Sequence, residues 1–245
     1  MSDLFPSSSS AGLRTAVRVD AGLRAHMQSI YQRMTLGLLI TFVTAFIASQ
    51  AATVMSALMN PVIALPLALA PLAVVWFGFN PRTMSSAKLK GSFVLLSVLY
   101  GLSFAIIFAV YVPADIVRAL LMTTIMFAGL SIFGYTTQRD LGPVGVFAVM
   151  GMFGLLAFSL VSMGASLLGY GFMPAGGTLD LIVSVAALVI FAALTAWETQ
   201  LAKETYNPGY GSEGNSRMAW MSALNLYINF IAIFQYLLHL IGNRE

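Results

Sequence analysis

Apolar residues fall into seven long stretches along the chain, and short polar segments separate them. A bilayer core about 30 Å thick requires about 20 consecutive apolar residues in one helix, and each stretch approaches or exceeds that length. The pattern predicts an all-α integral membrane protein with seven transmembrane helices. To within a few residues, the expected spans are 35–58, 61–79, 92–112, 116–135, 144–168, 179–199 and 220–241.

The second and the last of these stretches differ from the others. The second is the least regular, because Pro61, Pro66 and Pro71 punctuate it. Proline is nevertheless tolerated in membrane helices, since neighbouring helices and water satisfy the carbonyls that it frees. The last stretch, 220–241, is a seventh span or a re-entrant segment. A re-entrant segment would give six spans and return the C-terminus to the side of the N-terminus.

Positive charges gather in alternate connecting segments, which predicts the orientation. Cytoplasmic loops of membrane proteins carry the excess of Lys and Arg. With the N-terminus inside, only Arg118 and Arg244 of the twelve Lys and Arg residues lie outside. We therefore expect a multi-pass protein of the cell inner (plasma) membrane with a cytoplasmic N-terminus. Seven spans would place the C-terminus outside.

Residues 1–34 precede the first expected span, and we treat them as a cytoplasmic arm. Leu13, Val17 and Ala21 fall on one helical stripe with two arginines beside it. Such a stripe fits a short helix that lies at the inner membrane surface. A disordered tail is the alternative. Residues 35–242 form the expected transmembrane domain.

The composition agrees with a membrane protein and excludes several functions. Hydrophobic residues make up 59% of the chain and charged residues 9%, whereas soluble domains carry about 25% charged residues. There is no Cys, so thiolate chemistry is excluded. Basic residues are not interleaved with aromatics, which argues against a nucleic-acid partner. The two His lie at opposite ends of the chain, and no mid-membrane His could serve a protease. We expect no enzyme activity and no cofactor.

Glu198 is the clearest candidate for a functional side chain. Ionisable residues inside membrane spans are costly, and they usually mark a functional site. The sixth apolar helix has no breaker before Pro208, so Glu198 should lie one to two turns inside its end. The functional interpretation is a carboxylate that binds a proton or a cation, and on this view Glu198 is also the candidate metal ligand. The alternative is a carboxylate that reaches the interface and has no role.

Arg82 is a possible partner for Glu198. The second and sixth helices run in the same direction, so their C-terminal ends share one membrane face. Arg82 follows the second helix and could therefore meet Glu198 at a similar depth, as a latch at the cytoplasmic mouth. The other interpretation is that Arg82 is only a positive-inside anchor.

The last helix carries uncharged polar residues. Asn225 and Asn229 lie one turn apart on one face. Buried amides often join helices by hydrogen bonds, and lining a polar pathway is the alternative role. His239, near the outer end, is expected to be interfacial.

Three segments of the chain, at residues 127–145, 194–206 and 223–242, resemble the Bax inhibitor-1 (transmembrane Bax-inhibitor-motif) family in its bacterial form. FAGLSIFGYTTQRDLGPVG, residues 127–145, is similar to that family's LS-x-YGYTTKRDL signature. The family's AYDTQ-x-IK segment is similar to residues 194–206, LTAWETQLAKETY. The ending of the family is similar to residues 223–242, ALNLYINFIAIFQYLLHLIG. The residues that carry the first signature are Gly134, Tyr135, Thr136, Thr137, Arg139 and Asp140.

This resemblance implies a seven-helix bundle around one central helix. It also implies a pH-sensitive calcium leak, with calcium as the transported ion, and some members are associated with stress survival or with binding a membrane protease. The family's gate uses an Asp on each of the last two helices and an Arg on the second. By resemblance these positions fall on Glu198, Asn229 and Arg82.

The chain departs from the family pattern at Asn229. Two carboxylates in contact share a proton, whereas an amide does not titrate. Loss of one negative charge also weakens attraction for a divalent hard cation. We therefore expect a weaker or less pH-dependent leak than a relative with two aspartates would show. The alternative function is a non-conducting regulatory protein that binds a membrane protease or a stress-response complex.

Overall fold

The computed structural model describes residues 8–169 and 177–242, with side chains described from residue 21 onward. The described residues form helices and contain no strand. Seven of the helical segments are long and apolar enough to cross a membrane. The expected all-α, seven-span membrane architecture is confirmed. Along the chain the helices are α1 (Ser8–Gln50), α2 (Ala52–Leu58), α3 (Pro61–Gly78), α4 (Ser86–Phe104), α5 (Ile107–Val110), α6 (Pro113–Thr136), α7 (Gly142–Leu167), α8 (Thr178–Glu204), the 3₁₀ turn η1 (Pro208–Tyr210) and α9 (Gly211–Ile241).

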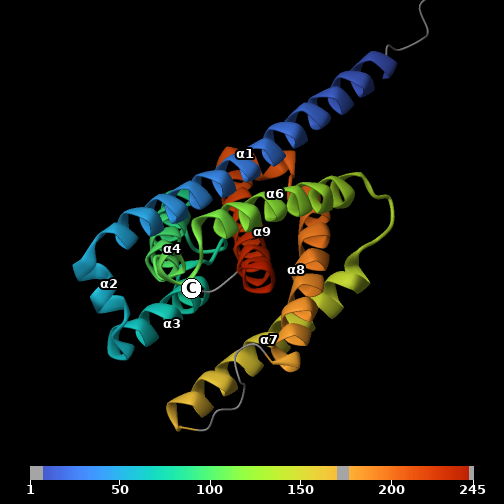
Figure 1. Cartoon of the computed structure of the whole chain (residues 1–245). Coiled ribbons are helices and arrows are strands. Elements are labelled where there is room, and N and C mark those ends of the chain that lie inside the picture. The colour runs from blue at the N-terminus through green and yellow to red at the C-terminus, as the bar shows by residue number, and fades with distance from the viewer. Residues whose placement is uncertain (1–7, 170–176, 243–245) are drawn as a thin grey trace, which may run out of the picture.

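Helix α9 is the central helix of the bundle (Figure 1). It packs against α1, α4, α6 and α8. Its side chains are apolar around most of its circumference and are the most buried among the candidate spans of the described residues. Leu226, Tyr227 and Ile233 are fully buried. A helix that is apolar on all sides is stable only when protein or lipid surrounds it. Here the neighbouring helices provide most of that cover, and the expected central helix is confirmed.

The proline-punctuated second span is a helix. Pro61 occupies the first turn of α3, and the Asn60 side chain accepts a hydrogen bond from the Val62 amide at 3.0 Å. Proline suits this position because the first amides of a helix have no partner within the helix. Pro66 and Pro71 lie inside α3, which packs on α4 at the edge of the bundle.

Two expected spans are interrupted in the structure. The first was expected to run to Leu58, but α1 ends at Gln50 and Ala51 has an extended backbone before α2. The third is divided between α4 and the short α5, with a turn at residues 105–106. Hydropathy reports the apolar character of a segment and not its backbone direction, so apolar residues at a break are not distinguished from apolar residues in a helix.

Helix α1 also begins far upstream of the expected span. It passes through residue 34, the expected end of the arm, without a break, and its candidate span covers Ala21–Gln50. The proposed stripe of Leu13 and Val17 lies outside the residues whose side chains are described. At the other end of the chain, α9 is one continuous helix over 31 residues. A continuous helix does not turn back within the membrane, which disfavours the six-span alternative.

Candidate functional site

Glu198 and Asn229 are in direct contact between α8 and α9. The Asn229 Nδ2 donates a hydrogen bond to the Glu198 Oε2 at 2.6 Å. Asn229 is buried in the central helix, and Glu198 is partly buried. Glu198 lies six residues before Glu204, the last residue of α8, which at 3.6 residues per turn is about 1.7 turns inside the helix. The expected depth of Glu198 is therefore confirmed.

Two glycines hold α8 close to its neighbours just before Glu198. A Cβ on Gly134 of α6 would overlap the carbonyl oxygen of Ala196, and a Cβ on Gly145 of α7 would overlap the Trp197 ring. Small residues allow membrane helices to approach at the backbone. The two residues that precede Glu198 are thus each covered by a glycine from a different helix, which fixes the position of α8 at this depth.

The α6–α7 loop is tied to α8 just after Glu198. Gln200 binds the loop backbone twice: its Nε2 donates to the Arg139 carbonyl at 2.8 Å, and its Oε1 accepts from the Leu141 amide at 2.9 Å. Within the loop, the Asp140 Oδ1 accepts at 2.8 Å from the amide of Gly142, the first residue of α7. A side chain that satisfies two backbone groups of a loop holds that loop against the helix.

The remaining signature residues lie at the end of α6. Lys203 of α8 donates to the Tyr135 carbonyl at 2.7 Å and lies 5.4 Å from the centroid of the Tyr135 ring. Thr136 binds the Ile132 carbonyl, and the Thr137 Oγ1 accepts from the Arg139 amide at 3.3 Å. The sequence singled out these signature residues only through their resemblance to the family. In the structure its described contacts are turn and packing contacts that position α8 and, with it, Glu198.

Comparison with known proteins shows the family of the chain. The family described as "Inhibitor of apoptosis-promoting Bax1" matches residues 23–245. The chain belongs to the Bax inhibitor-1 family. It is similar to the inner membrane protein YbhL of Escherichia coli (strain K12), with 34% identity over 99% of this chain and 100% of that protein. An uncharacterized protein of Caulobacter vibrioides is 33% identical, over 95% of this chain and 94% of that protein. An uncharacterized protein of Rickettsia prowazekii is 30% identical, over 92% of this chain and 92% of that protein.

Arg82, the third residue expected at a Bax inhibitor-1 gate, is not joined to Glu198 in this structure. It follows α3 in an exposed position, and its backbone amide binds the Asn80 side chain at 3.1 Å. None of the ion pairs among the described residues includes Arg82 or Glu198. Shared direction of two helices does not make them neighbours: α3 packs on α4, whereas α8 packs mainly on α6, α7 and α9.

Two polar clusters were missed by sequence reasoning. Between the N-terminal end of α8 and the C-terminal end of α9, the His239 Nε2 lies 2.8 Å from the Asp180 Oδ2. His239 was expected at this end, but its partner came from another helix. In the core, the hydroxyl of the fully buried Tyr227 lies 2.6 Å from the Thr41 Oγ1, which donates to the Ser97 carbonyl at 3.0 Å. A tyrosine among apolar residues carries no signal in sequence that it has a polar partner.

The described residues contain no cluster of three or more His, Cys, Asp or Glu that could hold a metal ion. Around Glu198, Asn229 is the polar neighbour that the structure joins to the carboxylate. The site is thus one carboxylate and one amide at the contact between two helices, and it presents at most three side-chain oxygens to a cation.

Proposed function

We propose that this chain is a cation leak pathway of the Bax inhibitor-1 type, with calcium as the transported ion and the Glu198–Asn229 contact as its closed gate. We place it in the inner membrane, with the N-terminus in the cytoplasm. The name of the Escherichia coli relative, an inner membrane protein, supports the location. The concentration of Lys and Arg in alternate connecting segments supports the orientation.

The observation that carries this proposal is the hydrogen bond between the Glu198 carboxylate and the Asn229 amide. It joins α8 to the central helix within both candidate spans. An ionisable side chain inside a span is expensive and is kept where it serves transport or proton transfer. A cation that passes along the α8–α9 contact meets this carboxylate, and the hydrogen bond to Asn229 must break before Oε2 is free to face the ion.

The chemistry of the pair suits passage better than retention. Calcium takes six to eight oxygen ligands in a stable site, and this pair offers a carboxylate and one amide oxygen. A relative with two carboxylates here would attract a divalent cation more strongly and would share a proton between them. The amide keeps its neutral form at all pH values, so Glu198 alone carries the titration at this contact.

Calcium flux into proteoliposomes tests the proposal. We expect wild-type protein to admit calcium to vesicles that contain a fluorescent indicator, and Glu198→Gln to reduce the flux. Glu213→Gln is the matched control, because Glu213 is an exposed carboxylate that binds Ser86 at the start of α4. Asn229→Asp should raise the flux and steepen its dependence between about pH 6 and pH 8. An identical flux and pH profile for wild type and Asn229→Asp would contradict the role of the pair.

The alternative is a regulatory membrane protein that conducts nothing and binds a membrane protease or a stress-response complex. Asn229 is the observation that favours it, because the second carboxylate of the gate is absent. On this view neither wild type nor Asn229→Asp passes calcium, and a tagged chain captures a protease complex from detergent-solubilised membranes. Calcium flux through wild type that Glu198→Gln reduces would rule it out.

A further inference from the structure

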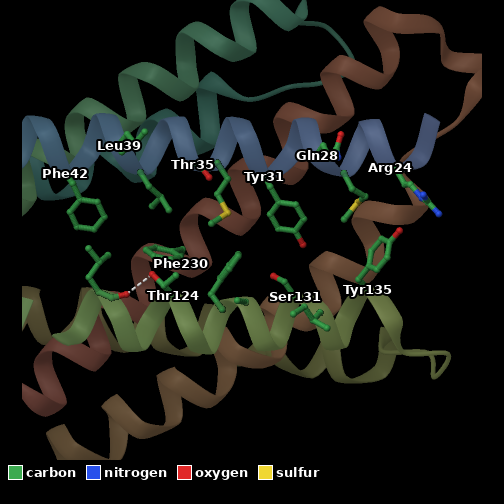
Figure 2. A pocket seen from close by; sticks show the side chains of 17 residues that line it. Arg24, Gln28, Tyr31, Thr35, Leu39, Phe42, Thr124, Ser131, Tyr135 and Phe230 are labelled. Carbon is green, nitrogen blue, oxygen red and sulfur yellow. Dashed lines mark hydrogen bonds between the residues drawn. The ribbon is translucent and has the colours of Figure 1, made fainter. Parts of the chain in front are cut away.

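A groove of about 750 Å³ opens between α1 and α6 (Figure 2). Both helices pack on α9, but they do not pack closely on each other, so the space between them is closed only at its floor. The buried side chains of Met27, Met34, Phe127 and Phe230 lie among the residues that line it. On its rim Leu39 is 59% exposed and Ile132 is 64% exposed. In a bilayer such a groove faces lipid laterally.

The groove has one polar end. Arg24, Gln28 and Tyr31 of α1 lie at this end, opposite Ser131 and Tyr135 near the end of α6 (Figure 2). Further along, toward Leu39 and Phe42, the lining is mainly apolar, and the Thr124 hydroxyl is already satisfied by the Leu120 carbonyl at 2.8 Å. The lining thus changes from polar to apolar in the same sense as a phospholipid changes from headgroup to tail.

Positive charge is concentrated at the polar end. Arg24 is exposed, and none of the ion pairs among the described residues includes it. Lys203 lies over the ring of Tyr135, which lines the same end of the groove. Two cations beside a tail-sized apolar groove complement a phospholipid whose headgroup carries a net negative charge, since each Lys or Arg near the surface attracts acidic lipid.

The groove is long enough for one acyl chain. Arg24 and Phe42 are 18 residues apart on α1, which corresponds to about 27 Å along a helix. One leaflet supplies about half of the 30 Å hydrocarbon core. An acyl chain whose headgroup lies beside Arg24 would therefore extend about as far as Met34, which is ten residues or about 15 Å along α1, and would lie in the groove that Phe230 also lines.

We propose that this groove binds one phospholipid with an acidic headgroup, with the phosphate beside Arg24 and Lys203 and one tail along the lining between α1 and α6. The lipid would then contact residues next to both Asn229 and Glu198. Phe230 follows Asn229 on α9, and Ser131 lies 3.5 Å from the Thr199 hydroxyl, next to Glu198. This proposal does not depend on the chain conducting calcium.

Native mass spectrometry of the delipidated, purified chain tests it, with phosphatidylglycerol and phosphatidylcholine of identical acyl chains as probes. Wild type should retain one phosphatidylglycerol about fivefold more tightly than phosphatidylcholine. Arg24→Gln should remove that preference. Arg139→Gln is the matched control, because Arg139 is an exposed cation of the α6–α7 loop that does not line the groove. It should leave the preference unchanged.

A second pair of variants tests the place of the tail. Ala128→Phe puts a ring into the groove from an exposed position on α6 and should reduce the binding of both lipids. Ile125→Phe, also on α6 and 72% exposed but outside the groove, should bind as wild type does. Equal retention of the two lipids by wild type would overturn the proposal. So would an equal loss in Arg24→Gln and Arg139→Gln, or unchanged binding in Ala128→Phe.

Discussion

Gly134 lies where α6 and α8 touch at the backbone, and Gly134→Ala is the sharpest test of how the signature positions the site. The added Cβ would lie 2.9 Å from the Ala196 carbonyl carbon and 3.1 Å from its Cα, and closer still to the carbonyl oxygen. These atoms belong to the backbone of α8 and cannot rotate away. We expect α8 to move relative to α6, and with it Glu198, two residues along.

Gly129 provides the matched control on the same helix, because a Cβ there would meet nothing within 4 Å. Replacing glycine by alanine inside a helix stabilises it by about 0.5–1 kcal/mol, and this gain is common to both variants. The difference between them therefore isolates the overlap. Overpacking of this kind costs about 1–3 kcal/mol, and the upper part of that range is expected where the neighbour is backbone.

Reversible unfolding in mixed micelles with increasing SDS measures the free energy of unfolding of each variant. We expect Gly134→Ala to be less stable than Gly129→Ala by that difference and to show altered calcium flux. Because the overlap is with backbone, the additional change Ala196→Gly should not restore stability. Equal stability of Gly134→Ala and Gly129→Ala would refute the close approach of α6 and α8.

Three further variants test the polar contacts between helices, each by the same unfolding measurement. Tyr227→Phe removes the buried hydroxyl 2.6 Å from Thr41 and should cost about 1 kcal/mol; an unchanged free energy would contradict the contact. Arg33→Lys replaces a guanidinium that donates to both the carbonyl and the hydroxyl of Ser216. It should lower the free energy of unfolding by about 1 kcal/mol, because an ammonium cannot form the same two-pronged contact. His239→Leu breaks the contact with Asp180 and should cost about 1–3 kcal/mol, since it leaves a partly buried carboxylate without that partner; a more stable variant would argue against it.

The sequence by itself predicted the seven spans and the depth of Glu198 in its helix. These features depend on local physics. An apolar stretch of sufficient length becomes a membrane helix because its backbone groups must bond within the segment. A carboxylate near the end of such a stretch is recognised as a candidate site because an ionisable side chain inside the membrane is costly in free energy. The family resemblance implied one central helix, and the packing of the structure identified it as α9.

Only the tertiary structure decided which side chains meet. Arg82 and Glu198 end helices that run in the same direction, yet their helices have different neighbours, whereas Asn229 and Glu198 touch because α8 packs on α9. The role of Gly134 likewise depends on the backbone of Ala196, which lies far away in sequence. The groove between α1 and α6 exists because both helices pack on α9 and leave a space between them. Hydropathy is a property of one segment at a time, whereas contacts and cavities depend on how several segments pack together.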